Sequence, residues 1–228
     1  MPERLRLQFY GSERNEDMLD SGFGPYGLTR LCYETGGLYF AAHPNRTTKG
    51  TVSRRATSNL AAHFTVFFDP DQMRRYQPDY VSTSQYLDHV RSNPARQALM
   101  EAAELSWTTQ MEDIRMRFVK RDEATLAESL TTAQRAAAIR KPQIDRICQL
   151  LLSGEQGRDS LKEPRWQAGY DLALGRALAT KVRTDGYNTM LALAKQGMEF
   201  KQERNNTWIL RSGTEYANSS LEKMARQA

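Results

Sequence analysis

Cysteine is scarce in the sequence, and long apolar runs are absent. The 228 residues include two cysteines, Cys32 and Cys148, which excludes a small disulfide-rich scaffold. No stretch approaches the roughly 18 apolar residues that a membrane-spanning helix needs, so we expect no membrane span. The 14 glycines and 8 prolines are too few for a collagen-like or low-complexity chain. The hydrophobic fraction of 39% instead describes a surface-rich, largely helical protein of one or two domains.

Charge of one sign is not in large excess either. The chain carries 32 basic and 27 acidic residues, a net charge of +5, and the basic residues are scattered. This pattern disfavours nucleic-acid binding, which stays open only as a weak alternative through Arg54, Arg55, Arg74 and Arg75. The first residues lack the apolar core of a signal peptide, so the cytoplasm is the expected compartment by default.

Motifs for catalysis or metal binding are also lacking. The three histidines have no metal-ligand spacing, and no nucleophile elbow or phosphate-binding loop is present. Asp79, Ser82 and Ser84 loosely resemble an Asp-x-Ser-x-Ser metal motif, but the spacing is wrong by one residue. We therefore interpret Ser82 or Ser84 as a helix cap. The chain is expected to be non-enzymatic, with no catalytic, cofactor-binding or metal-ligating residues.

The N-terminal part, residues 1–62, predicts a small α/β unit followed by an irregular loop. A helix opened by Pro25 carries Leu28 and Leu31 on one face and ends at Gly36 and Gly37. The run Leu38–Ala41 then predicts a short buried strand. With no evident partner, that strand would be left unpaired or would pair with residues 63–68, and it leaves self-association open. We expect residues 1–60 to be the least stable part of the chain.

Residues 63–121 predict a linker of short helices. After a strand at 63–68, a short helix ends at Pro78, a second is capped near Ser82, and Pro94 opens a third. The linker leads into a helical domain.

Residues 122–228 predict that domain as a long antiparallel helical hairpin. Asp122 is a good N-cap for the first helix, which Pro142 should kink or break. After a polar loop at 153–162, Pro164 opens a helix to about Met198 that would pack on the first one. A β-hairpin is expected near 198–211, around Asn205 and Asn206, before a final helix capped near Ser219.

Part of the chain resembles the von Willebrand factor type A domain (VWFA). In Ser21–Ala41, a leucine-containing helix ends in Thr35-Gly36-Gly37 and leads into a strand, which is similar to the last helix and last strand of that domain. Residues 68–86 and 163–191 resemble the region that follows the domain in a group of bacterial proteins. The resemblance implies a small remnant of a doubly wound, Rossmann-like domain in front of the helices.

The same resemblance bears on cofactors. The family binds Mg²⁺ at motifs that would lie upstream of Met1, so the full family domain would bind Mg²⁺ and this chain would not. Either the chain is a fragment, or its start is annotated late, or the site has been lost. The amphipathic helix still unfinished at Ala228 favours a fragment.

These observations predict a non-enzymatic protein-binding or scaffold protein. A possible partner surface, or the pocket of a helical small-ligand-binding domain or enzyme as the alternative, is expected around Trp166, Tyr170 and Tyr187. The expected partner is another protein.

Overall fold

In the computed structural model the chain is mainly helical, as the sequence predicts. It describes residues 3, 5, 7, 19–21, 26–36, 40–42, 75–76, 80–108, 114–197, 200, 202, 204–211, 213, 216 and 219–227. Two small antiparallel sheets accompany the helices in this part of the chain. The elements, in chain order, are β1 (Leu19–Ser21), α1 (Tyr26–Thr35), β2 (Phe40–Ala42), α4 (Thr83–Arg91), α5 (Pro94–Thr108), β3 (Arg117–Val119), α6 (Glu123–Ser153), the 3₁₀ helix η1 (Glu155–Ser160), α7 (Pro164–Lys195), β4 (Thr207–Ile209) and α8 (Ser219–Gln227).

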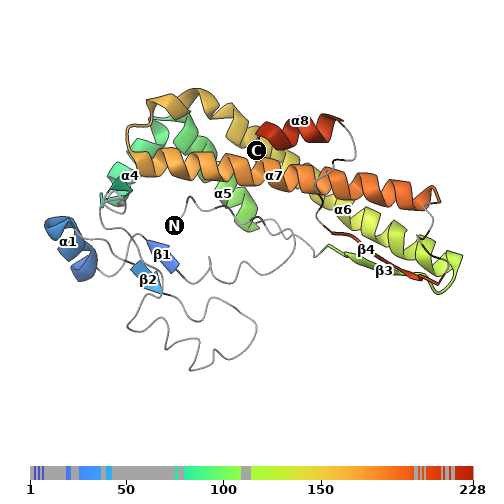
Figure 1. Cartoon of the computed structure of the whole chain (residues 1–228). Coiled ribbons are helices and arrows are strands. Elements are labelled where there is room, and N and C mark those ends of the chain that lie inside the picture. The colour runs from blue at the N-terminus through green and yellow to red at the C-terminus, as the bar shows by residue number, and fades with distance from the viewer. Residues whose placement is uncertain are drawn as a thin grey trace.

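The long helices α6 and α7 lie side by side and form the body of the molecule (Figure 1). Lys141 contacts Asp185 and Lys181 contacts Asp145, so the residue numbers rise along one helix as they fall along the other. The two helices therefore run in opposite directions. Helix α5 packs against one end of the pair, the β3–β4 sheet covers the other end, and α8 lies along α7 (Figure 1).

Two separate apolar clusters hold these elements together. The first joins α5 to the adjoining halves of α6 and α7; its members are fully or nearly fully buried and include Leu99, Ile147, Leu151 and Tyr170. The second lies between β3 and the opposite ends of α6 and α7, around Phe118, Leu130, Tyr187 and Leu191. Burial of these apolar side chains away from water is the main force that stabilises the fold.

Local capping explains where several helices begin. Asp122 accepts a hydrogen bond from the Thr125 backbone N–H at 2.7 Å, which confirms that it is the N-cap of α6. Ser82 and Gln85 form a reciprocal capping box at the start of α4, which confirms the interpretation of Ser82 as a cap. Gly36 follows α1 with φ at +65°, a conformation that suits glycine.

Pro142 does not break α6, one of the two effects that the sequence predicts for it. The helix is continuous from Glu123 to Ser153. Buried residues lie on both sides of the proline, with Ala137 before it and Ile144 and Ile147 after it. Packing of both halves against neighbouring elements offsets the backbone hydrogen bond that proline cannot donate.

The strand pairing differs from what the sequence predicts. Thr207–Ile209 pairs with Arg117–Val119, and most of the segment expected as its hairpin partner, 198–201, lies outside the described residues. Phe40–Ala42 pairs antiparallel with Leu19–Ser21, so the strand expected at 38–41 has a partner within the chain. This antiparallel pair is not the parallel sheet of a doubly wound domain. The strand expected at 63–68 and the loop at 43–62 lie outside the described residues.

Two further segments depart from expectation. Leu5 and Leu7 are each only 4% exposed and belong to the first apolar cluster, so part of the N-terminal region is built into the helical core. The polar loop expected at 153–162 contains the 3₁₀ helix η1, which packs closely on α5. Asn93 joins the two segments, because its side-chain amide donates to the Gly157 carbonyl at 3.1 Å and to the Ser160 hydroxyl at 2.8 Å.

Candidate binding site

The structure buries the three aromatic residues predicted as a partner surface and does not bring them together. Trp166, Tyr170 and Tyr187 are 6%, 1% and 6% exposed. Trp166 and Tyr170 belong to the first apolar cluster, whereas Tyr187 belongs to the second, at the other end of α6 and α7. These residues are core residues and do not share one pocket; Tyr187 alone among them lines a cavity, a small one of about 210 Å³ on the α6 side of the second cluster.

Each of the three side chains has a structural role. The guanidinium carbon of Arg96 lies 4.3 Å from the centre of the Trp166 ring, a cation–π contact. The Tyr170 hydroxyl donates to the Leu151 carbonyl, and burial raises the pKa of Tyr170 to about 12. Burial likewise raises the pKa of Tyr187 to about 12. Both phenols stay neutral at physiological pH and act as hydrogen-bond donors.

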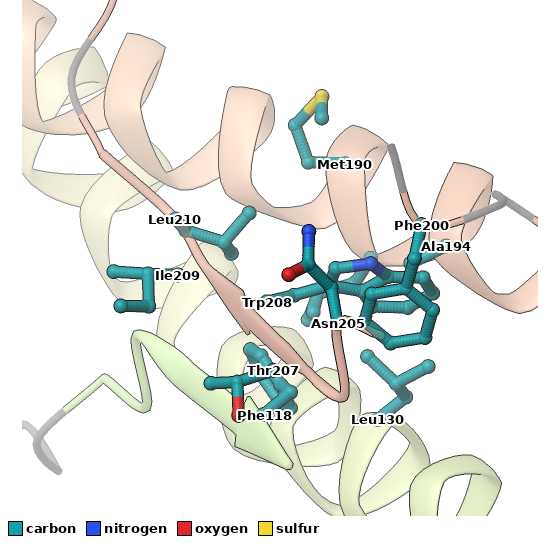
Figure 2. Close-up of a pocket in the computed structure, with 11 residues that line it drawn as sticks. Phe118, Leu130, Met190, Ala194, Phe200, Asn205, Thr207, Trp208, Ile209 and Leu210 are labelled. Carbon is teal, nitrogen blue, oxygen red and sulfur yellow. The ribbon is translucent and has the colours of Figure 1, made fainter. Parts of the chain in front are cut away.

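An apolar cavity of about 470 Å³ lies elsewhere, between α7, α6 and the β3–β4 sheet (Figure 2). Its volume falls within the roughly 300–1,000 Å³ of ligand-binding pockets. The rings of Phe200 and Trp208 stack in its wall, with centroids 4.8 Å apart and an angle of 28° between their planes. The complete lining is Phe118, Leu130, Met190, Leu191, Ala194, Phe200, Asn205, Thr207, Trp208, Ile209 and Leu210.

The cavity runs along one edge of β4. Four consecutive residues, 207–210, line it. Since successive side chains of a strand point to opposite faces, a cavity on one face would be lined by alternate residues only. Lining by four in a row therefore places the cavity beside the strand, and β3 occupies the other edge.

The hydrogen-bond pattern shows which backbone groups of β4 point toward that edge. The Leu210 N–H donates to the Met116 carbonyl at 2.9 Å, and the Lys120 N–H donates to the Asn206 carbonyl. Hydrogen-bonded pairs alternate in an antiparallel ladder, so Trp208 also faces β3. The N–H and C=O groups of Thr207 and Ile209 consequently point away from β3, toward the cavity side.

Sequence reasoning missed this site, although part of its signal was present. Met116 and Phe118 alternate with Arg115 and Arg117, the period of a half-buried strand. That alternation predicts a strand at 117–119 but says nothing about its partner. The cavity itself depends on the meeting of segments about 90 residues apart, which no local pattern encodes.

Most of the other residues singled out in the sequence lie outside the part of the chain that the structure describes. Arg54, Arg55, Arg74 and Asp79 lie outside the described residues, whereas Arg75 is exposed. Burial raises the pKa of the Cys148 thiol to about 11, so it is not a reactive thiolate. The described residues include no group of histidine, cysteine or acidic side chains able to hold a metal ion. Among the described helices, none is both long and apolar enough to cross a bilayer.

Comparison with known proteins identifies no relative. No protein-family model, no curated protein and no solved structure matches the chain.

Proposed function

We propose that this chain is a non-enzymatic protein-binding module. Its ligand is an extended segment of a partner protein, which adds as a third strand to the edge of β4 opposite β3 and inserts a large apolar side chain into the adjoining cavity. The observation that carries this proposal is the lining of the cavity by four consecutive residues, which places it along a strand edge.

The two halves of the site supply different parts of the recognition. The outward N–H and C=O groups of Thr207 and Ile209 offer main-chain hydrogen bonds to an added strand, largely without regard to its sequence. The stacked Phe200 and Trp208 rings and the neighbouring Ala194 offer an apolar socket that selects a large aliphatic or aromatic side chain. Strand addition with a side-chain anchor is an established mode of peptide recognition.

The antiparallel α6–α7 pair is the scaffold in this proposal. Its two helices, of 31 and 32 residues, are those of the predicted helical hairpin. The sheet is held on the end of the pair away from α5 through contacts with Leu130, Tyr187 and Leu191. The proposal also retains the resemblance of residues 21–41 to the end of a type A domain. The order of helix α1, Gly36 and strand β2 supports that part.

A small apolar molecule is the second candidate ligand for the same cavity. The volume of about 470 Å³ favours it, because drug-sized molecules occupy cavities of this size. The two ligands differ in what they need from β4. A small molecule needs only the apolar walls, whereas an added strand also needs the outward backbone groups.

A random-peptide display selection against the whole chain tests the proposal. We expect enrichment of peptides with alternating apolar residues around one large side chain, with binding measured afterwards on synthetic peptides. Met190→Trp, which fills the cavity, should abolish binding, while Leu193→Trp should not, because Leu193 is 42% exposed on α7 and outside the lining.

A proline pair separates strand addition from simple cavity filling. Ile209→Pro removes an outward N–H on the cavity edge, and Val119→Pro makes the same change on the outer edge of β3. Strand addition predicts weaker peptide binding in Ile209→Pro alone. Equal binding by both proline variants would leave only the small-molecule candidate. If the selection yields no peptide whose binding is lost in Met190→Trp, the proposed protein ligand is refuted.

A further inference from the structure

The outer face of the β3–β4 sheet places an arginine beside an exposed isoleucine. On β3, Phe118 is buried, whereas Arg117 and Val119 are exposed, so these two side chains lie on the face turned away from the core. Arg117 lies directly opposite Ile209, which is 54% exposed. Directly paired residues of an antiparallel ladder share a face, so Ile209 belongs to the outer face as well.

Arg211 adds a second arginine to the same face. The Leu210 backbone N–H donates to the Met116 carbonyl at 2.9 Å, so the ladder continues beyond Ile209. Residues two apart in a strand share one face, which places the exposed Arg211 next to Ile209 on the outer face. Arg117 and Arg211 are consequently diagonal neighbours, about 7–8 Å apart, and Ile209 adjoins both.

The charge that an added strand would meet at this point is a local property. Charges farther apart than about 8 Å are largely screened at physiological ionic strength, so the nearest side chains dominate. Beside Ile209 these are the guanidinium groups of Arg117 and Arg211. The position therefore favours a negatively charged side chain in a bound strand.

We propose that the segment added to β4 is acidic, with an aspartate or glutamate adjacent to its apolar anchor. This inference rests on the proposed strand addition and names the chemistry of the partner. A partner residue opposite Ile209 would turn its side chain to the outer face, diagonal to Arg211. Arg117 lies two strand spacings away, about 9–10 Å, from which its long side chain reaches across Ile209.

The alternation of a strand fixes the pattern of the partner sequence. Where the anchor points toward the cavity, the residues before and after it point to the outer face. A carboxylate there can pair with an arginine, whose planar fork of donors matches its two oxygen atoms. A lysine or arginine at that position would meet like charges. The backbone edge accepts many sequences, so this face adds selectivity to that of the anchor.

The composition of the outer face favours a protein over a nucleic acid. Its described residues are Arg117, Val119, Thr207, Ile209 and Arg211, none of which is aromatic. Single-stranded nucleic acids are bound largely by stacking of bases on aromatic rings. The aromatic residues of the two strands are Phe118, which is buried, and Trp208, which stacks on Phe200.

The peptides enriched by display selection against the whole chain give the first test. We expect aspartate or glutamate next to the anchor, and a synthetic peptide with this glutamate changed to glutamine should bind about three- to tenfold more weakly. Enriched peptides without an acidic preference, or equal affinity of the two synthetic peptides, would overturn this inference and leave strand addition standing. Recovery of no peptide would refute strand addition itself, and this inference with it.

Matched arginine variants locate the carboxylate. Arg117→Gln and Arg211→Gln should each weaken binding of the glutamate peptide about two- to fivefold and leave the glutamine peptide nearly unchanged. Arg135→Gln, which removes the same charge from an exposed position of α6, should change neither. Arg211→Glu should bind the matching lysine peptide more tightly than the parent chain does. Equal effects of the three glutamine variants would contradict the assignment.

Single-stranded oligothymidylate tests the other class of macromolecule that an arginine-bearing face can bind. We expect it not to displace the glutamate peptide at physiological ionic strength. Displacement, together with weaker oligothymidylate binding in Arg117→Gln and Arg211→Gln, would make the face a nucleic-acid surface and overturn the proposal.

Discussion

Glycine-to-alanine substitutions should change stability in opposite directions at different positions of this chain. Gly169 and Gly186 lie inside α7, where glycine is roughly 0.5–1 kcal/mol less favourable than alanine. An added Cβ would meet Leu99 Cδ2 or Leu221 Cδ1 at 4.0 Å, an ordinary van der Waals contact. Each substitution should therefore raise the free energy of unfolding by about 0.5–1 kcal/mol, and the double variant by about 1–2 kcal/mol, because the sites are far apart.

Gly157 should respond in the other direction. A Cβ there would lie 2.8 Å from the Ala95 backbone nitrogen and 3.0 Å from Asn93 Oδ1. These atoms belong to the start of α5 and its cap, so they cannot move without loss of the hydrogen bonds that Asn93 makes. Gly157→Ala should cost about 1–3 kcal/mol.

Urea denaturation followed by circular dichroism measures all four variants. A gain of 1 kcal/mol corresponds to a melting-temperature rise of about 2–4 °C for a chain of this size. A Gly157→Ala variant as stable as the parent would refute the close packing of η1 on α5. A loss of stability in Gly169→Ala would show that the α7 surface at that position is more tightly covered than the structure indicates.

Three further predictions concern the core and the charged groups. Leu191→Ala, at a residue 1% exposed, should cost about 2–5 kcal/mol, whereas Leu193→Ala, at 42% exposed, should change the unfolding free energy by less than about 0.5 kcal/mol in thermal melts. Leu7→Ala should likewise cost about 2–4 kcal/mol and Leu28→Ala less than about 0.5 kcal/mol in urea titrations, since Leu7 is 4% and Leu28 is 48% exposed; equal effects would place Leu7 outside the core. Burial lowers the pKa of Lys181, but its contacts with Asp145 and Asp185 raise the pKa by more, so the net shift is upward. The stabilisation from Lys181 should be complete below its ordinary pKa of 10.5 and lost as the pH rises through the higher folded value, and Lys181→Met should remove this alkaline loss in urea titrations from pH 8 to 12.

Helix positions were predictable from sequence because their signals are local. Asp122 meets the Thr125 backbone three residues later, and Ser82 meets Gln85 in the same way. Pro94 and Pro164 open helices within their own first turn. None of these features depends on the rest of the fold. The local sequence left open whether Pro142 kinks or breaks its helix, because the effect depends on packing on both sides of it, which is not local.

Strand pairing and the candidate site were not predictable for the corresponding reason. Arg117 lies opposite Ile209 in the β3–β4 ladder, and the chain between them contains all of α6 and α7. The register is therefore set by how the helix pair folds back, and local turn residues such as Asn205 and Asn206 do not determine it. The two cavities depend on the same folding, because each is the space that residues from distant segments leave unfilled.

The aromatic stripe of α7 illustrates how a correct local pattern can indicate the wrong function. Trp166, Tyr170 and Tyr187 are apolar-face residues, as their spacing suggests, but the middle of α7 does not continue the apolar core. The buried Thr180 and Thr184 occupy that middle, each donating its hydroxyl to a backbone carbonyl one turn earlier at 2.8 Å, and the Lys141–Asp185 pair lies beside them.

This polar middle divides the helix pair into two apolar clusters with separate contacts. Substitutions at positions that share no partners act nearly independently on stability. The first cluster can therefore maintain the stability of the fold while side chains of the second cluster, which borders both cavities, are substituted. Substitutions around Trp208 need not disturb the packing of Tyr170. The side chains of a binding site at the end of the pair near the β3–β4 sheet can therefore vary with little effect on the first cluster.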